Sequence, residues 1–76
     1  MNIQQKFETV RTIMKNYPEA EFNGTEGLIW ADNSDVLHQI RLDIIRAGID
    51  EVYDIIYYKP FEKFNLSLHL TKGRSW

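Results

Sequence analysis

Apolar positions recur along the chain with two different periods, which predict two helices and four strands. The longest helical stretch runs from Ser34 to Ile49, and at about 100° per residue its apolar side chains fall on two stripes. The first stripe is Val36, Leu37, Ile40, Ile44 and Ala47, and the second is Leu42, Ile45 and Ile49. Ser34 is the expected N-cap, and Gly48 is the expected left-handed residue at the other end. A helix with two apolar sides needs two packing partners.

An earlier stretch, from Ile3 to Tyr17, also has its apolar residues at helical spacing. Asn2 and Gln5 have the spacing of a capping box, in which each side chain accepts a hydrogen bond from the backbone N–H of the other residue. Pro18 ends the pattern, because the residue before a proline is pushed towards extended geometry. We therefore predict a first amphipathic helix over residues 3–17.

The remaining apolar stretches are short and extended. Residues 20–22 and 28–31 flank an Asn-Gly sequence, which is a strong hairpin signal. Residues 51–59 are rich in β-branched and aromatic side chains, and residues 63–72 alternate between apolar and polar. The alternation predicts a core-facing set and a solvent-facing set in each of these two strands. The predicted core set is Tyr53, Ile55, Tyr57, Phe64, Leu66, Leu68 and Leu70, and the predicted outer set is Val52, Ile56, Tyr58, Asn65, Ser67, His69 and Thr71.

The predicted order of elements is α-β-β-α-β-β, which indicates an α+β fold with two helices packed on one face of an antiparallel sheet. We expect residues 1–76 to form a single domain, because 76 residues provide one core only. Cysteine is absent, so disulfides and thiolate zinc sites are excluded. With no leader peptide and no apolar run of about 18 residues, we expect a cytoplasmic protein that does not enter the membrane.

Charge is distributed unevenly, although the net charge is only −2. Between Lys15 and Arg41 the chain has no Lys or Arg, and its carboxylates there are Glu19, Glu21, Glu26, Asp32 and Asp35. If these residues share a surface, they would steer the protein towards a basic groove on another macromolecule. The simpler interpretation is a solvated acidic region that keeps a small domain dispersed.

Two residue groups have the composition of a catalytic or metal site. Ser67, His69 and Asp54 include a nucleophile, a base and an orienting carboxylate, but neither a nucleophile elbow nor a glycine-rich oxyanion loop accompanies them. Asp35 and His38 have a spacing that allows two ligands on one metal, and no further His and carboxylate pair completes the set. We therefore predict no enzymatic activity, no cofactor and no metal.

Acidic and apolar surface residues indicate binding of another macromolecule instead. Ile outnumbers Leu, and Asn, Lys and Tyr are frequent; these residues have AT-rich codons, which favours a phage or mobile-element gene. We expect a small protein-binding module that docks on a larger host protein, such as a nucleic-acid-handling or defence enzyme, and inhibits it. Surplus apolar surface also allows a homodimer. The expected partner-binding residues are Glu19, Glu21, Glu26, Asp32, Asp35, Tyr58 and Trp76.

The alternative function is binding of nucleic acid by the basic C-terminal part of the chain. Cations that neutralise phosphates, together with an aromatic ring that stacks on a base, are the elements of such a site. The residues that would form it are Lys59, Lys63, Lys72, Arg74 and Trp76. The acidic net charge argues against this alternative.

Overall fold

The computed structural model describes residues 2–24, 27–49 and 52–68. Its elements are α1 (Ile3–Met14), β1 (Glu21–Asn23), β2 (Leu28–Ala31), α2 (Ser34–Arg46), β3 (Val52–Tyr58), a short 3₁₀ helix η1 (Lys59–Phe61) and β4 (Lys63–Leu68). The predicted order α-β-β-α-β-β is confirmed.

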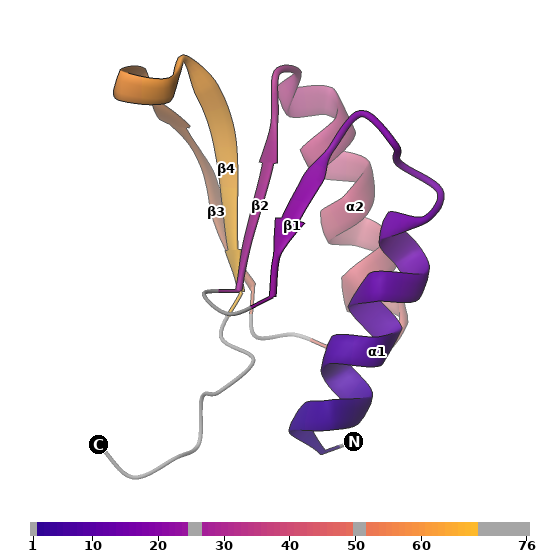
Figure 1. The fold of residues 1–76 in the computed structure, drawn as a ribbon. Coiled ribbons are helices and arrows are strands. Elements are labelled where there is room, and N and C mark those ends of the chain that lie inside the picture. The colour runs from indigo at the N-terminus through magenta and orange to yellow at the C-terminus, as the bar shows by residue number, and fades with distance from the viewer. Residues whose placement is uncertain (1, 25–26, 50–51, 69–76) are drawn as a thin grey trace, which may run out of the picture.

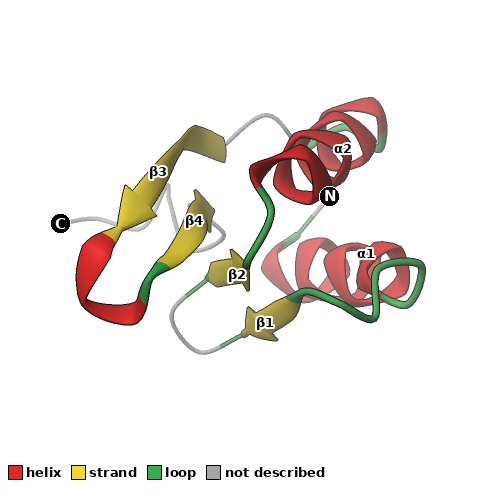
Figure 2. Ribbon diagram, turned by 90° about the horizontal axis from the view of Figure 1, so that it is seen from above, coloured by secondary structure: helices red, strands yellow, loops and turns green. Residues whose placement is uncertain are grey.

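The four strands form one antiparallel sheet in the order β1-β2-β4-β3, so that β1 and β3 are its edges. Both helices lie on the same side of the sheet, as Figures 1 and 2 show. We call this side the inner face and the opposite side the outer face. Helix α1 contacts α2 and β1, and α2 contacts β2, β3 and β4. The predicted α+β fold, with two helices on one face of an antiparallel sheet, is confirmed.

The start of α1 follows the prediction, and its end does not. Gln5 N donates to Asn2 Oδ1 at 2.8 Å and Asn2 N donates to Gln5 Oε1 at 2.9 Å, which confirms the capping box. The helix ends at Met14, three residues before the predicted end at Tyr17. Its last turn tightens, because Tyr17 N donates to the Met14 carbonyl three residues earlier at 3.0 Å. Apolar spacing alone does not detect this change of geometry.

The N-cap of α2 is Asn33, so the prediction of Ser34 is wrong by one residue. Asn33 has extended backbone geometry, and its side-chain Oδ1 accepts a hydrogen bond from Asp35 N at 2.7 Å. Ser34 is already the first helical residue. Asn and Ser are equally good caps, and the two residues are adjacent, so the sequence offered no means of choosing between them.

The other end of α2 confirms the predicted role of Gly48, which has φ +98°. Gly48 N donates to the Ile45 carbonyl at 3.0 Å, and Ile49 N donates to the Ile44 carbonyl at 3.2 Å. These two bonds form a Schellman motif, which satisfies carbonyls that the helix leaves without partners. The motif turns Ile49 back into the core, where it is fully buried beside Ile44.

The core lies between the inner face of the sheet and the two helices. It consists of Val10, Ile29, Ala31, Leu37, Ile40, Ile44, Ile49, Leu66 and Leu68. The first stripe of α2 therefore supplies Leu37, Ile40 and Ile44 to the core, as predicted. On the second stripe, Leu42 and Ile45 are exposed, Leu42 by 40%. Helix α1 thus covers only part of the apolar surface of α2.

In β3 the predicted division into core and outer residues is wrong at the start of the strand. A register shift between Val52 and Ile55 puts Val52 opposite Leu68 and packs it against the core, while Tyr53 is half-exposed. An extra residue of this kind is a β-bulge, and it reverses the side-chain alternation on one side of the irregularity. Ile55 packs against the core, as predicted.

A hydrogen bond between Tyr17 and Asp43 connects the end of α1 to α2. The Tyr17 hydroxyl donates to Asp43 Oδ2 at 2.5 Å. This hydrogen bond, followed by desolvation, raises the pKa of Tyr17 above its ordinary value of 10.0. The fold therefore favours the neutral phenol, and its contribution to stability is complete below pH 10.0 and is lost as the pH rises through the raised pKa.

We expect Tyr17→Phe to lower the free energy of unfolding by about 1 kcal/mol at neutral pH. The difference from the wild type should shrink above pH 10.0, where the wild type loses the same hydrogen bond by ionisation. Urea unfolding at neutral and alkaline pH measures both effects. Tyr57→Phe, at an exposed tyrosine of β3, is the matched control. Equal losses in the two variants would contradict a stabilising role for the Asp43 contact.

Candidate functional site

Three aromatic side chains meet on the outer face of the sheet, which none of the described helices covers. Trp30 comes from β2, Tyr58 from the end of β3 and Phe61 from η1. The ring centroids are 5.6 Å apart for Trp30 and Tyr58, 5.2 Å for Trp30 and Phe61, and 5.0 Å for Tyr58 and Phe61. Such separations and tilted geometries are those of favourable aromatic pairs. Phe61 nevertheless remains 60% exposed. We call these three residues the aromatic cluster.

Strand alternation places Trp30 on the outer face. Its neighbours Ile29 and Ala31 are buried in the core, so the side chain between them points to the opposite side of the sheet. Trp30 pairs with Asn65 of β4, and Asn65 pairs with Ile56 of β3. The three side chains thus form one row across the outer face. Ile56 ends this row and is 53% exposed.

The connection between β3 and β4 positions the other two rings. Pro60 lies in η1, and the fixed φ of this proline suits the start of a helical turn. Glu62 has φ +53°, and its N–H donates to the Lys59 carbonyl at 3.0 Å, which closes the turn. Because the chain reverses within these few residues, Phe61 comes to lie against Tyr58 of the preceding strand.

Asn65 was predicted to be solvent-exposed, and this prediction is wrong. The residue is only 5% exposed. Its Nδ2 donates to the Ile29 carbonyl at 3.4 Å, and its Oδ1 accepts a hydrogen bond from Ser67 Oγ at 3.1 Å. Asn65 lies between Trp30 of β2 and Ile56 of β3, and the alternation within β4 does not reveal these neighbours. The amide is buried and satisfied, as buried polar groups usually are.

Charged residues border the aromatic cluster. Lys63 Nζ lies 3.9 Å from Glu21 Oε1 and 3.9 Å from Asp32 Oδ1. Glu21, Trp30, Phe61 and Lys63 line a shallow hollow of about 390 Å³. Both carboxylates are largely exposed, so these ion pairs contribute little to stability. We use the name outer-face patch for Ile56 and the aromatic cluster together with Glu21, Asp32 and Lys63.

The outer-face patch contains three of the seven predicted partner-binding residues: Glu21, Asp32 and Tyr58. Glu19, just before β1, and Asp35, in the first turn of α2, are both exposed. They lie at the end of the molecule where β1 begins and β2 ends, at the top of Figure 1. Four carboxylates therefore gather towards one end of the fold. The other two predicted residues, Glu26 and Trp76, lie outside the described residues.

The prediction missed Trp30 and Phe61 as site residues. The sequence did contain a signal for Trp30, because it alternates with two core residues and must point away from them. Phe61 offered no comparable signal, since its position depends on the turn at Glu62. Of the residues proposed for nucleic-acid binding, Lys59 is exposed on η1 and Lys63 is paired with carboxylates. Lys72 and Arg74 lie outside the described residues.

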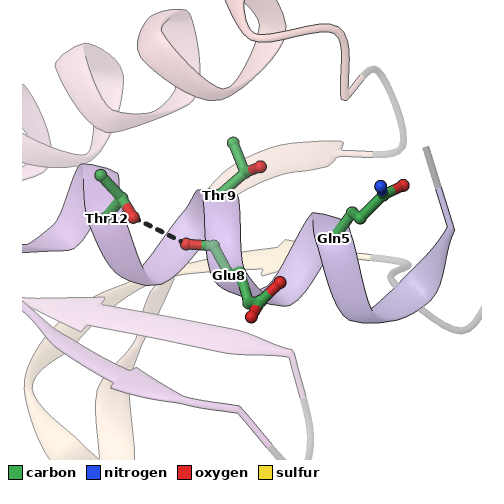
Figure 3. A pocket seen from close by; sticks show the side chains of 4 residues that line it. All are labelled: Gln5, Glu8, Thr9 and Thr12. Carbon is green, nitrogen blue, oxygen red and sulfur yellow. Dashed lines mark hydrogen bonds between the residues drawn. The ribbon is translucent and has the colours of Figure 1, made fainter.

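Two other hollows lie on the helical side of the molecule. The first has a volume of about 460 Å³ and is lined by Gln5, Glu8, Thr9 and Thr12, all from α1 (Figure 3). The Thr12 hydroxyl donates to the Glu8 carbonyl at 2.9 Å, so it is engaged by its own helix. The second, of about 520 Å³, is lined by Ile3, Gln4, Phe7, Arg11 and Gly24. The first lining contains one carboxylate, Glu8, and the second contains one cation, Arg11.

The three residues that have the composition of a catalytic site, although no catalysis was predicted for them, can be followed only in part. Ser67 is half-buried and donates its hydroxyl to Asn65, Asp54 is exposed on the edge strand, and His69 lies outside the described residues. Asp35 and His38 are both exposed on α2. Among residues 2–24, 27–49 and 52–68, no group of three or more His, Cys, Asp or Glu residues could hold a metal ion.

Neither helix in the described part of the chain is long and apolar enough to cross a membrane.

In comparisons with known proteins, no family model, curated protein or solved structure gives a significant match to this chain.

Proposed function

We propose that this protein is a non-enzymatic binding module that docks on a larger protein through the outer-face patch and inhibits it. The observation that carries the proposal is the aromatic cluster beside Ile56 on the outer face, where Tyr58, Phe61 and Ile56 are exposed and Trp30 is partly buried. Contiguous exposed apolar surface of this kind marks interaction sites, and aromatic residues dominate the energy of protein interfaces.

The arrangement of charges supports a protein partner. An apolar centre within a polar border is the usual anatomy of a protein interface, and here the border is formed by Glu21, Asp32 and Lys63. Glu19 and Asp35 add negative charge at the same end of the fold. Such a surface favours a partner with a basic groove and increases the rate of association with it. Host nucleic-acid-handling and defence enzymes present grooves of this type, consistent with a phage or mobile-element origin.

The exposed rings also favour a second candidate, a protein that stacks its aromatic cluster on single-stranded nucleic acid. The two carboxylates beside Lys63 oppose this candidate, because they would repel phosphates. Salt distinguishes the two functions. Retention on immobilised DNA or RNA that falls steeply with added salt would favour the nucleic-acid binder.

We expect Phe61→Ala to abolish or strongly weaken partner binding without unfolding the protein, because Phe61 is the most exposed ring of the cluster. A central aromatic anchor contributes about 2 kcal/mol or more, so the dissociation constant should rise about 30-fold. The measurement is affinity capture from host lysate, followed by calorimetry with the purified partner.

Leu42→Ala is the matched control, because Leu42 is an exposed apolar residue on α2, on the helical side of the molecule. It should retain the captured protein. The double variant Glu21→Gln with Asp32→Asn should slow association and reduce its dependence on salt. Equal capture by wild type, Phe61→Ala and the double variant would rule out the outer-face patch as the docking surface.

A further inference from the structure

The two edges of the sheet are protected to very different degrees. β1 has three residues, begins with Glu21 and is contacted by α1. β3 has seven residues, of which only Asp54 is charged, and it contains neither Lys nor Pro. Short length, charge and covering elements are the usual means by which proteins prevent a sheet edge from pairing with another chain. β3 has a bulge near its start, but residues 55–58 pair regularly with β4.

Large apolar side chains are exposed on both sides of β3. Ile56 and Tyr58 belong to the outer row, and Tyr57, which lies opposite Phe64, belongs to the inner row yet is 52% exposed. Tyr57 is thus exposed although its neighbour Phe64 packs against the core. In Figure 2, β3 lies at the edge of the sheet farthest from α1. An additional strand beside β3 would bury side chains on both faces of the sheet.

We propose that two copies of this chain pair antiparallel through β3, around a twofold axis at Ile56, to form a continuous eight-stranded sheet. Charge does not oppose a second copy at this edge. In the register centred on Ile56, Asp54 lies opposite Tyr58 of the second copy, and the two Asp54 carboxylates do not face each other. The same register pairs Ile55 with Tyr57, and cross-strand pairs of aromatic and β-branched residues are favourable.

The exposed area is sufficient for a weak dimer. Tyr53, Ile56, Tyr57 and Tyr58 are 39–53% exposed. An aromatic side chain can bury about 150–250 Å², so the three tyrosines alone offer roughly 200–350 Å² per copy, to which Ile56 adds. Together with the strand backbone, the total approaches the lower limit of stable interfaces, about 1,200 Å². The dimer should therefore dissociate on dilution.

The chain has no cysteine, so a single introduced thiol tests the register. Facing residues of an antiparallel pair have Cα atoms about 4.5–5.5 Å apart, which is within disulfide range. Ile56→Cys should give a covalent dimer under mild oxidation, because residue 56 meets its own copy at the axis. Leu42→Cys, at a similarly exposed position on α2, should remain monomeric. Ile56→Cys that cross-links no faster than Leu42→Cys would overturn the proposal.

Sedimentation equilibrium provides an independent measurement on the unmodified chain. From about 1 µM to about 500 µM, the wild-type mass should rise from that of the 9.0 kDa monomer towards twice that value. Ile56→Lys should remain monomeric, because two ammonium groups would meet at the axis, whereas Leu42→Lys should dimerise like the wild type. Circular dichroism checks that both variants are folded.

A wild-type mass that stays at 9.0 kDa over the whole range would overturn the dimer. Such a failure would not affect the proposed docking function. Phe61→Ala should lose the protein partner and still dimerise, because Phe61 lies outside β3. The two proposals can thus fail separately.

Discussion

Leu66→Ala is expected to lower the free energy of unfolding by about 3–4 kcal/mol, because it removes a fully buried side chain and leaves a cavity. Leu66 lies on β4, a central strand of the sheet. It is opposite Ile29 of β2 on one side and Ile55 of β3 on the other. A domain of this length has a total stability of about 4–11 kcal/mol. The substitution should therefore remove roughly a quarter or more of the total stability.

Urea unfolding followed by circular dichroism measures this loss. Leu42→Ala is the matched control, since it makes the same chemical change at a residue that is 40% exposed. It should cost clearly less, about 0.5–1 kcal/mol. If both variants lost the same stability, the inner face of β4 would not be the centre of the core.

Gly27→Ala is expected to cost about 2–4 kcal/mol, because two separate effects add. Gly27 has φ +69°, a left-handed conformation that disfavours any side chain. An added Cβ would also lie 2.7 Å from the Leu68 carbonyl oxygen, which is closer than real Cβ contacts allow. The contact cannot relax freely, since Leu68 N donates to the Gly27 carbonyl at 2.8 Å.

Gly48→Ala separates the two effects. Gly48 also has a positive φ, +98°, but an added Cβ would meet no described atom within 4 Å. This variant should therefore show the conformational cost alone, about 1–2 kcal/mol. Thermal and urea unfolding of the two variants give the comparison. A loss in Gly48→Ala as large as that in Gly27→Ala would mean that the approach to Leu68 has no energetic consequence.

The elements of this fold could be predicted because their signals lie within single segments. The capping box of Asn2 and Gln5, the Schellman glycine at position 48 and the alternation of Leu66 and Leu68 each depend on residues close in sequence. The predictions failed where segments distant in sequence determine the burial of a residue or the register of a strand. Asn65 is buried at a position between Trp30 and Ile56 of the two neighbouring strands, and the register shift after Val52 is defined only against β4.

The candidate site was predictable to a smaller extent, for the same reason. Glu21, Asp32 and Tyr58 were expected to act together, and the structure brings them to one surface around Trp30 and Phe61. Their proximity arises from antiparallel pairing of strands that are more than 30 residues apart in sequence. Residue types could indicate an acidic and aromatic surface, but only the sheet order shows which of these residues are neighbours.

The molecule measures 32 × 28 × 17 Å, and among the described residues α1 and α2 both lie on the inner face of the sheet, so that these elements form a slab. A partner bound to the outer face would cover the second side of the sheet. Both faces of the strands would then be shielded from water. Attachment and folding would then be thermodynamically linked, since a ligand that binds only the native state shifts the folding equilibrium towards it. On the proposed function, the protein would be most resistant to unfolding and proteolysis while it is bound to its partner.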